Sequence, residues 1–393
     1  MYCYKKCQSS FHGKISEIPG ISVDNFTGSN ATSRAYFLSH FHADHIQGLD
    51  EPSLLEHLKK KNVFIYTTEV TLTIMRHEFG DLELLEYVKA LSKESKLITL
   101  PSVPEDNLEE MFLEVTLIPA GHCMGSTMFL FKTTKKTILY TGDFRIRIND
   151  IPKYAKLHER NGDPINIDAM YVDTTFIKEE FEDFPKRSDT VDTIIDEIDK
   201  WLRTGTKYAV AIYMPANFTY EFIFNQIHKR LNTKVYVNDK KWRLYGTIPE
   251  LVPGITNDDS ETRIHLCTSR SERNSHSSCV SQEHEKYLFV YLTAMKWENY
   301  NVDFTPVNRV TPTRLDACFA THCSRREVVS FVSYFKPVKV EGFPNDYVAA
   351  TPIKKKNDEF VLSPKDRSIP GVKRKCDTTV DKENMKNVTK KIF

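Results

Sequence analysis

The 393-residue sequence predicts a layered α/β fold with two structured parts, followed by a basic tail. The first 175 residues contain many short apolar runs, and most of these are followed by polar residues, Gly or Pro, as strand ends require. From about residue 180, apolar residues at helical spacing alternate with strand-like runs, as in parallel α/β units. Hydrophobic residues make up 40% of the chain, which is enough for a sizeable core, but their pattern ends near residue 350.

The first part is expected to consist mainly of strands. A β-prone run at residues 34–39 leads directly into a cluster of histidines, and four similar runs follow it. Many short strands with a few helical stretches between them indicate layers of sheet and helix. The four later strands are expected at residues 115–118, 127–131, 137–140 and 169–172.

The second part is expected to begin with an amphipathic helix. Apolar residues recur at helical spacing from Val191 to Leu202, behind Ser188 and Asp189, which we expect to cap the helix. The elements expected after it are a buried strand at 208–213, a second helix at 220–231 and a long polar loop at 254–284.

A final strand and helix are expected after this loop. Residues 316–321 form another apolar run. Ser324 and Glu327 then have the spacing of a capping box, in which the two side chains satisfy backbone groups at a helix start. One face of this helix is apolar and carries Val328, Phe331, Val332 and Phe335.

Charge is unevenly distributed along the chain. The 54 Lys and Arg residues nearly balance the 53 Asp and Glu residues, so the net charge of +1 creates no general attraction to nucleic acid or membrane. Residues 351–393 alone carry 12 basic and 6 acidic side chains, and we expect a disordered basic tail at 349–393. Within it, Lys373 to Lys375 match a nuclear-import signal, which predicts a nuclear protein.

The sequence argues against a membrane or secreted protein. No apolar run approaches the ~20 residues of a membrane span. The first residues lack the apolar stretch of a signal peptide. Eight cysteines in so long a chain fit a reducing compartment better than a disulfide framework.

The strongest chemical signal is a dense cluster of metal-ligand residues after the first strand. His40 and His42 are two residues apart at a strand end, so both can point to the same side and bind one metal ion. Asp44 and His45 follow where the chain turns, and they can address a second ion. Buried histidines that serve only in packing are rarely so dense.

One cluster cannot complete two coordination spheres, so further ligands are expected at the ends of other strands. His122 lies in a glycine-flanked loop after one strand, and Asp143 and Asp173 lie just past the next two. Each of these alone could be an ordinary turn residue. Their common position at strand ends instead favours one metal centre.

These motifs, in this order, resemble those of the metallo-β-lactamase fold, and more specifically those of the DNA cross-link repair nucleases that carry a β-CASP domain. The resemblance covers roughly residues 8–345, with Met124 standing where the family typically has proline. It implies an αββα sandwich interrupted by an α/β β-CASP domain. The segments that carry the resemblance are 21–24, 35–40, 119–123, 139–145, 173–176, 317–319 and His322.

The resemblance also implies the division of the chain. Residues 1–178 would form the first portion of the metallo-β-lactamase domain, and residues 179–308 the β-CASP domain. Residues 309–348 would return to the metallo-β-lactamase domain, followed by the tail at 349–393.

The resemblance implies two metal sites that share one carboxylate. It places one or two Zn²⁺ ions there, and Mg²⁺ or Mn²⁺ could also support activity. The first ion would be held by His40, His42, His122 and Asp143, and the second by Asp44, His45, Asp143 and His322. Catalysis is expected to involve Asp44, His45, Asp143, Asp173 and His322.

Three further acidic residues are assigned supporting roles. Asp173 matches a family motif and is expected to orient a ligand histidine. Asp24 is expected to do the same, although an ordinary turn residue is an equally good interpretation. Glu221 matches the acidic first motif of the β-CASP domain.

The second part contains a candidate structural zinc site. His265 with Cys267, and His276 with Cys279, are two closely spaced pairs of ligand types that suit a tetrahedral zinc ion. In the family one ligand histidine falls where this chain has Tyr236, so His276 would have to replace it. The alternative is a polar surface loop with two free thiols.

Candidate DNA contacts are less specific. A run in the second part mixes cations with an aromatic residue, as single-strand binders do. A solvated helix face is the alternative. The run consists of Lys240, Lys241, Trp242 and Arg243.

Taken together, the sequence predicts a metal-dependent DNA nuclease with 5′-to-3′ exonuclease activity and structure-specific endonuclease activity at hairpins and overhangs. Single-stranded ends, overhangs and hairpins are its expected substrates, in double-strand break end processing and interstrand cross-link repair. We expect a monomer in the nucleus that binds end-joining repair proteins and does not associate with a membrane.

Three alternatives remain open from the sequence. The first is an RNA-processing β-CASP endonuclease, which the segments flanking the motifs disfavour. The second is a small-molecule metallo-hydrolase, which the 148 residues between Asp173 and His322 disfavour because they leave room for an inserted domain. The third is an inactive scaffold, which the complete set of ligand types disfavours.

Overall fold

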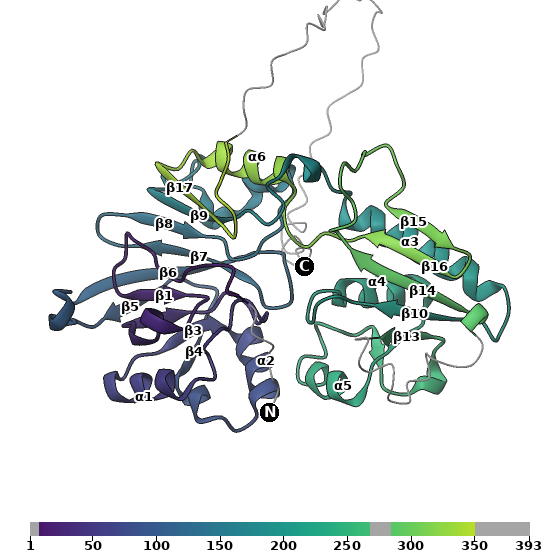
Figure 1. The fold of residues 1–393 in the computed structure, drawn as a ribbon, viewed down its shortest axis with the longest axis horizontal. Helices are drawn as coiled ribbons and strands as arrows, with labels where there is room; N and C mark the ends of the chain where they lie inside the picture. The colour runs from purple at the N-terminus through teal and green to yellow at the C-terminus, as the bar shows by residue number, and fades with distance from the viewer. Residues whose placement is uncertain (1–7, 268–283, 350–393) are drawn as a thin grey trace, which may run out of the picture. The chain divides into compact units, whose positions relative to one another are not determined.

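The computed structural model describes residues 8–267 and 284–349 (Figure 1). The expected basic tail from residue 350 onward, with its import signal, lies outside the described residues, as do His276 and Cys279. Within the described ranges, no helix is both long and apolar enough to cross a membrane.

The first part contains two sheets. A four-stranded parallel sheet has the order β1-β2-β3-β4, and a mixed six-stranded sheet has the order β17-β9-β8-β7-β6-β5. The strands of the first sheet are β1 (Ile21–Val23), β2 (Ala35–Phe37), β3 (Ile65–Thr68) and β4 (Val88–Leu91). Those of the second are β5 (Lys96–Leu100), β6 (Met111–Pro119), β7 (Thr127–Lys132), β8 (Thr137–Tyr140), β9 (Ala169–Asp173) and β17 (Lys339–Phe343).

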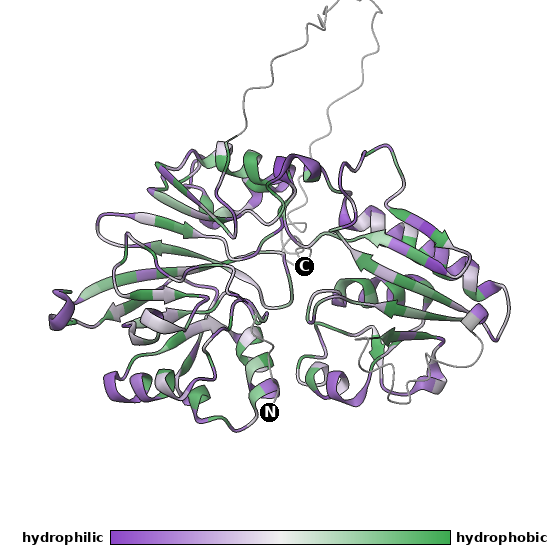
Figure 2. Ribbon diagram, viewed as in Figure 1, coloured by the Kyte–Doolittle hydropathy of each residue, from purple (hydrophilic) through white to green (hydrophobic). Residues whose placement is uncertain are grey.

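The two sheets pack face to face, with helices on their outer faces. Val23 and Phe37 from one sheet and Phe131 and Tyr171 from the other belong to one buried cluster. Helices α1 (Pro52–Lys61) and α2 (Glu69–Phe79) pack behind the four-stranded sheet, and α6 (Arg325–Phe335) packs behind the six-stranded sheet. This is the expected αββα sandwich. Figure 2 shows that its strands are mainly hydrophobic, whereas α1 has both hydrophilic and hydrophobic residues.

The second part is an α/β unit built on a seven-stranded sheet of order β12-β11-β13-β10-β14-β16-β15. Its strands run parallel except for β15, which is antiparallel to β16. The strands are β10 (Ala209–Tyr213), β11 (Val235–Tyr236), β12 (Ile255–Thr256), β13 (Ile264–Cys267), β14 (Tyr287–Thr293), β15 (Val307–Thr311) and β16 (Arg314–Cys318). The helices are α3 (Arg187–Arg203), α4 (Glu221–Leu231) and α5 (Asp239–Tyr245).

Most expected elements are present, but the structure differs from the expectation in three respects. The polar stretch at 254–284 contains β12 and β13, because Ile264 and Leu266 are enough to bury a short strand beside β10. The seven-stranded sheet includes β15 and β16, so it extends past residue 308 to Cys318. Sequence patterns did not show this, because a strand's sheet is decided by distant pairing.

The third difference concerns helix α3. It begins at Arg187, so Ser188 and Asp189 lie inside its first turn and do not cap it. The residue before the helix is Lys186, whose side chain makes no capping hydrogen bond. A Ser-Asp pair before an apolar helical run is therefore not a sufficient start signal.

Helix α6 begins with the expected capping box. The Ser324 hydroxyl accepts from the backbone N–H of Glu327, and the Glu327 carboxylate accepts from the backbone N–H of Ser324. Ser324 is buried, so these backbone groups would otherwise lack partners. The box sets where the helix begins after the loop that carries His322.

We therefore expect Ser324→Ala to lower the free energy of unfolding by about 1 kcal/mol, because it removes a used N-cap. Ser188→Ala is the matched control, since Ser188 is half-buried in the first turn of α3 and does not cap the helix; its loss should stay below about 0.5 kcal/mol. Urea unfolding of both variants measures this difference. Equal losses would contradict the assigned role of Ser324.

Candidate metal centre

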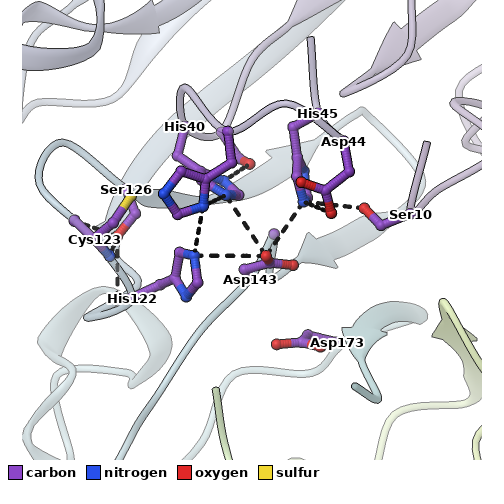
Figure 3. Close-up of polar contacts among 12 residues, drawn as sticks. Ser10, His40, Asp44, His45, His122, Cys123, Ser126, Asp143 and Asp173 are labelled. Carbon is purple, nitrogen blue, oxygen red and sulfur yellow. Dashed lines mark hydrogen bonds and ion pairs between the residues drawn. The ribbon is translucent and has the colours of Figure 1, made fainter. Parts of the chain in front are cut away.

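The candidate ligands lie at one edge of the six-stranded sheet and in the loop after β2. Strands β6 and β8 are both antiparallel to β7, and β9 is parallel to β8, so all three end at the same edge. His122, Asp143 and Asp173 follow or end these strands, and the loop after β2 carries His40 to His45. Figure 3 shows His40, His45 and His122 around Asp143.

Four ligand atoms form a compact set. The distance from His42 Nδ1 is 3.1 Å to His40 Nε2 and 3.0 Å to His122 Nε2. Asp143 Oδ2 lies 3.6 Å from the Nε2 atoms of both His40 and His122. A tetrahedral zinc site with bonds of ~2.0–2.1 Å would separate its ligand atoms by about 3.3 Å. The observed distances therefore fit a single ion between these four atoms.

The hydrogen bonds of the opposite ring nitrogens show which atoms are free to bind an ion. His42 Nε2 lies 2.8 Å from the carbonyl oxygen of Asn217, and His122 Nδ1 lies 3.1 Å from that of Thr321. A carbonyl oxygen only accepts, so both of these ring nitrogens must carry the proton. Consequently His42 Nδ1 and His122 Nε2 present lone pairs to the centre.

His40 reaches the same state through two neighbours. The Ser39 hydroxyl donates to Asp24 Oδ2 at 2.5 Å, so it can only accept from His40 Nδ1 at 2.9 Å. His40 Nε2 therefore also lacks a proton. Three lone pairs thus converge, with those of His40 and His122 each about 3 Å from that of His42, an arrangement that a cation would stabilise.

A second set of ligand atoms shares the same carboxylate oxygen. His45 Nε2 lies 3.3 Å from Asp143 Oδ2 and 3.5 Å from Asp44 Oδ2. The structure places His322 beside His122 and Asp143, with one ligand atom of each within 4.8 Å of the others. His322 Nδ1 lies 3.9 Å from Asp143 Oδ2, so His322 also borders this carboxylate.

Cys123 is a member of this centre that the sequence did not single out. Its sulfur lies within 4.8 Å of the ligand atoms of His40, His42 and His122. The residue is partly exposed. The only sequence signal was its position directly after His122.

Asp24 supports the loop after β2. Its side chain is fully buried, and Oδ2 accepts from His45 Nδ1 at 2.9 Å and from the Tyr140 hydroxyl at 2.8 Å. Its Oδ1 accepts from the backbone N–H of Ser39 at 2.7 Å. Through these contacts Asp24 links His45 to Tyr140 and to the backbone of Ser39.

Asp173 makes the corresponding contact on the other side. Its Oδ2 accepts from His322 Nδ1 at 2.8 Å, while Oδ1 accepts from the backbone and hydroxyl of Thr175. His322 Nε2 is therefore left without a proton when the ring is neutral. Asp173 is placed to orient His322.

Electrostatics divide the five histidines into two groups. Burial, followed by the neighbouring imidazoles, holds the pKa values of His40 and His122 well below their usual value, and burial also lowers the pKa of His42. Burial alone would lower the pKa of His45 and His322 as well. The carboxylates of Asp143 and Asp24 instead raise the pKa of His45, and those of Asp173 and Asp143 raise the pKa of His322 to about 9.

Glu221 lies at the start of α4 and does not belong to these ligand sets. Its carboxylate accepts from the Tyr245 hydroxyl of α5 at 2.6 Å. Burial raises its pKa above the usual value for a carboxyl group, although the bond to Tyr245 opposes this shift. The structure thus places Glu221 in the core of the second part.

The candidate structural zinc site is only half described. His265 and Cys267 lie two residues apart on β13, with His265 buried. The sheet register pairs His265 with Tyr236 of β11, and the centres of the two rings are 5.4 Å apart. His276 and Cys279 lie outside the described residues, so the site stays a prediction.

The cationic run at 240–243 lies on helix α5, and its members differ in environment. Lys240 forms an ion pair of 2.7 Å with Glu78 of α2. Lys241 is buried and donates to Asn217 Oδ1 at 3.0 Å. Trp242 is half-buried and Arg243 is exposed. The run is therefore not a uniform cationic face.

The chain is similar to several proteins whose names refer to Artemis or to DNA repair. The family model described as DNA repair metallo-beta-lactamase matches residues 249–343. "Protein artemis" of Gallus gallus is 33% identical over 351 residues, which are 86% of this chain and 48% of that protein. "Protein artemis" of Homo sapiens is 31% identical over 350 residues, which are 86% of this chain and 49% of that protein.

A more distant relative has a related name. "DNA cross-link repair protein pso2/snm1" of Schizosaccharomyces pombe is 28% identical over 254 residues, which are 63% of this chain and 40% of that protein. The chain spans about half the length of the Artemis proteins that it matches. Together with the αββα sandwich and the histidine–aspartate centre, these comparisons show that the chain is similar to the Artemis proteins and, in part, to the DNA-repair metallo-β-lactamase family.

Proposed function

We propose that this protein is a metal-dependent DNA nuclease that hydrolyses phosphodiester bonds. The observation that carries the proposal is the shared position of Asp143 Oδ2. That oxygen lies 3.6 Å from ligand nitrogens of His40 and His122 on one side and 3.3 Å from His45 Nε2 on the other. A carboxylate between two ligand sets suits a pair of ions, which is a common arrangement in phosphodiesterases.

The residues present suit zinc in the first site. Three imidazole nitrogens and one carboxylate oxygen are typical zinc ligands. In the second site, Asp44, His45 and Asp143 would hold an ion, with His322 as a further ligand. The two carboxylates of this second set are also ligands that suit Mg²⁺ or Mn²⁺. Bound ions would lower the pKa of a coordinated water and offset the charge on the phosphodiester group.

The chain's own residues would position and balance these ions. Asp24 would hold His45 through Nδ1, and Asp173 would hold His322 through the same atom of its ring. Asp44, Asp143 and Asp173 would keep the centre negative enough to bind divalent ions. Without those ions the carboxylates would repel a polyanion, because like charges repel at short range.

Several features of the activity belong to this proposal. We infer a 5′-to-3′ exonuclease that also cuts hairpins and overhangs, and that acts in end processing and cross-link repair. The names of the similar proteins, which refer to Artemis and to cross-link repair, support this role. A nuclear location, contact with end-joining proteins and a monomeric state complete the proposal.

The decisive experiment compares substrates of the purified chain. Labelled hairpin, overhang and single-stranded DNA are incubated side by side, together with RNA strands of matched sequence. Faster cleavage of DNA supports the proposal. Preferential cleavage of RNA would instead indicate an RNA-processing enzyme, and no cleavage of either would overturn the nuclease assignment.

The shared carboxylate gives the first prediction for activity. Asp143→Ala should reduce DNA cleavage by more than about 100-fold and lower the bound metal per chain, because it removes a ligand oxygen from both sets. Cleavage rates and elemental analysis measure the two effects. Asp346→Ala, which changes an exposed carboxylate, is the control. Near-normal turnover with full metal content would refute the shared-ligand assignment.

The contact between Asp173 and His322 gives a second prediction. Asp173→Asn preserves the size of the side chain but replaces the charged acceptor of the His322 Nδ1 proton with a neutral amide. We expect cleavage to fall about 10–100-fold. Cleavage assays with Asp346→Asn as the exposed counterpart test this expectation. Unchanged turnover would show that Asp173 does not orient His322.

The candidate structural zinc gives a third prediction. If His265, Cys267, His276 and Cys279 hold zinc, the double change of Cys267 and Cys279 to Ser should remove one zinc equivalent and destabilise the second part. His40→Ala should leave that equivalent in place. Elemental analysis and thermal unfolding provide the measurement. Equal zinc content in wild type and the double variant would show that the loop site does not exist.

A further inference from the structure

We propose that the second part of the chain completes the metal centre. Its loop Asn217–Thr219 would set His42 as a ligand, and Lys241 would be the positioning residue that holds this loop. The inference rests on the metal centre of the proposed function and extends it to residues outside the ligand set. It also makes metal affinity depend on how the seven-stranded α/β unit docks.

The first step is the contact between this loop and His42. The loop follows β10 and precedes α4. The Asn217 carbonyl oxygen accepts from His42 Nε2 at 2.8 Å and from the Thr219 hydroxyl at 2.9 Å. Because the carbonyl requires a proton on Nε2, it directs the lone pair of Nδ1 toward His40 and His122. The tautomer of a first-part ligand is thus set by a second-part backbone atom.

The second step is a contact of the same loop with the His122 segment. The carbonyl oxygen of Phe218 accepts from the backbone N–H of Met124 at 2.7 Å. Met124 lies two residues after His122, so consecutive carbonyls of one loop bind two histidine-bearing segments. A proline at position 124 could not make this bond, because it has no N–H.

The backbone of this loop is unusual. Phe218 has a φ of 60°, in the left-handed region that bulky residues rarely adopt. Residues held in such conformations require support from their surroundings, and they concentrate at functional sites. Phe218 is buried, and its ring lies 6.5 Å from that of Phe41, which sits between His40 and His42. The strained residue is therefore packed against the ligand loop.

Lys241 supplies support from helix α5. Its residue exposure is 8%, and Nζ donates to Asn217 Oδ1 at 3.0 Å. The same ammonium lies 5.7 Å from the centre of the Phe218 ring, within the range of a cation–π contact. A buried ammonium is costly unless it is hydrogen-bonded, so its position is specific. Lys241 therefore contacts two of the three loop residues.

Helix α5 is itself attached to the first part of the chain. Lys240, the neighbour of Lys241, pairs with Glu78 near the end of α2 at 2.7 Å. The helix thus connects α2 to the loop that contacts His42 and Met124. Because binding linkage is reciprocal, docking that improves metal binding must itself be stabilised by the metal.

The test measures metal affinity of the full-length chain rather than cleavage. Metal-free protein is titrated with Co²⁺ against a competing chelator, and the visible absorption of bound Co²⁺ is recorded. Lys241→Met should weaken binding at the histidine site about 10–100-fold and change the absorption spectrum, as expected for the loss of a residue that orients a ligand. Lys241→Arg retains a charged donor and should recover most of the affinity.

Two further variants separate positioning from general stability. Lys229→Met makes the same change at an exposed lysine of α4, and its affinity should equal that of wild type. Asn217→Asp keeps an acceptor for Lys241, whereas Asn217→Leu removes it while leaving the backbone carbonyl in the chain. We expect Asn217→Leu to weaken Co²⁺ binding several-fold more than Asn217→Asp. This pair also decides the question if Lys241→Met fails to fold.

The outcomes distinguish this inference from the proposed function. If wild type binds Co²⁺ and the Lys241→Met and Asn217→Leu variants bind it with the same affinity and spectrum, the inference is overturned and the metal centre stands. If wild type binds no Co²⁺, Zn²⁺ or Mn²⁺, the proposed function fails and the inference fails with it. Selective weakening in these two variants, with recovery in Lys241→Arg, supports the inference.

Discussion

The site depends on three unprotonated imidazole nitrogens that face one another, with His42 Nδ1 lying 3.1 Å from His40 Nε2 and 3.0 Å from His122 Nε2. Such lone pairs repel unless a cation lies between them. Each ring is held in that state by an acceptor on its far side: Ser39 for His40, the Asn217 carbonyl for His42 and the Thr321 carbonyl for His122. These acceptors come from both parts of the chain, so the whole fold takes part in preparing the centre.

Charge balance explains the remaining residues of the site. The carboxylates of Asp24, Asp143 and Asp173 lie in a buried region, where isolated charges are unfavourable. His45 and His322 stand between them, and their raised pKa values reflect this negative surrounding. Divalent ions can replace that balance because they also neutralise buried carboxylates. The same ions would offset the phosphodiester charge of a nucleic-acid substrate, which connects the electrostatics of the centre to the proposed chemistry.

The α/β part of the chain therefore contributes directly to the candidate metal centre. In chain order, the last strand of its sheet is β16, and His322 follows soon after it. The loop after β10 supplies the acceptor for His42. Helix α5 carries Lys241, which donates to Asn217 Oδ1, and Lys240, which pairs with Glu78 of α2. The cationic run that resembled a DNA-binding face therefore includes residues that join the two parts of the chain. Only Arg243 of the run is exposed.

The sequence by itself determined the α/β class, most strand positions and the candidate ligands, because these depend on local periodicity and on rare residue types at strand ends. His40, His42, His122 and Asp143 could be selected in this way. The tertiary structure decided what local patterns do not contain: the strands β12 and β13, the assignment of β15 and β16 to the seven-stranded sheet, the proximity of Cys123 and the contacts of Asn217 and Lys241. The physical reason is that these features arise from pairing and hydrogen bonding between segments far apart in the chain. A backbone carbonyl such as that of Asn217 is present in every residue, so only the folded position makes it a determinant of the site.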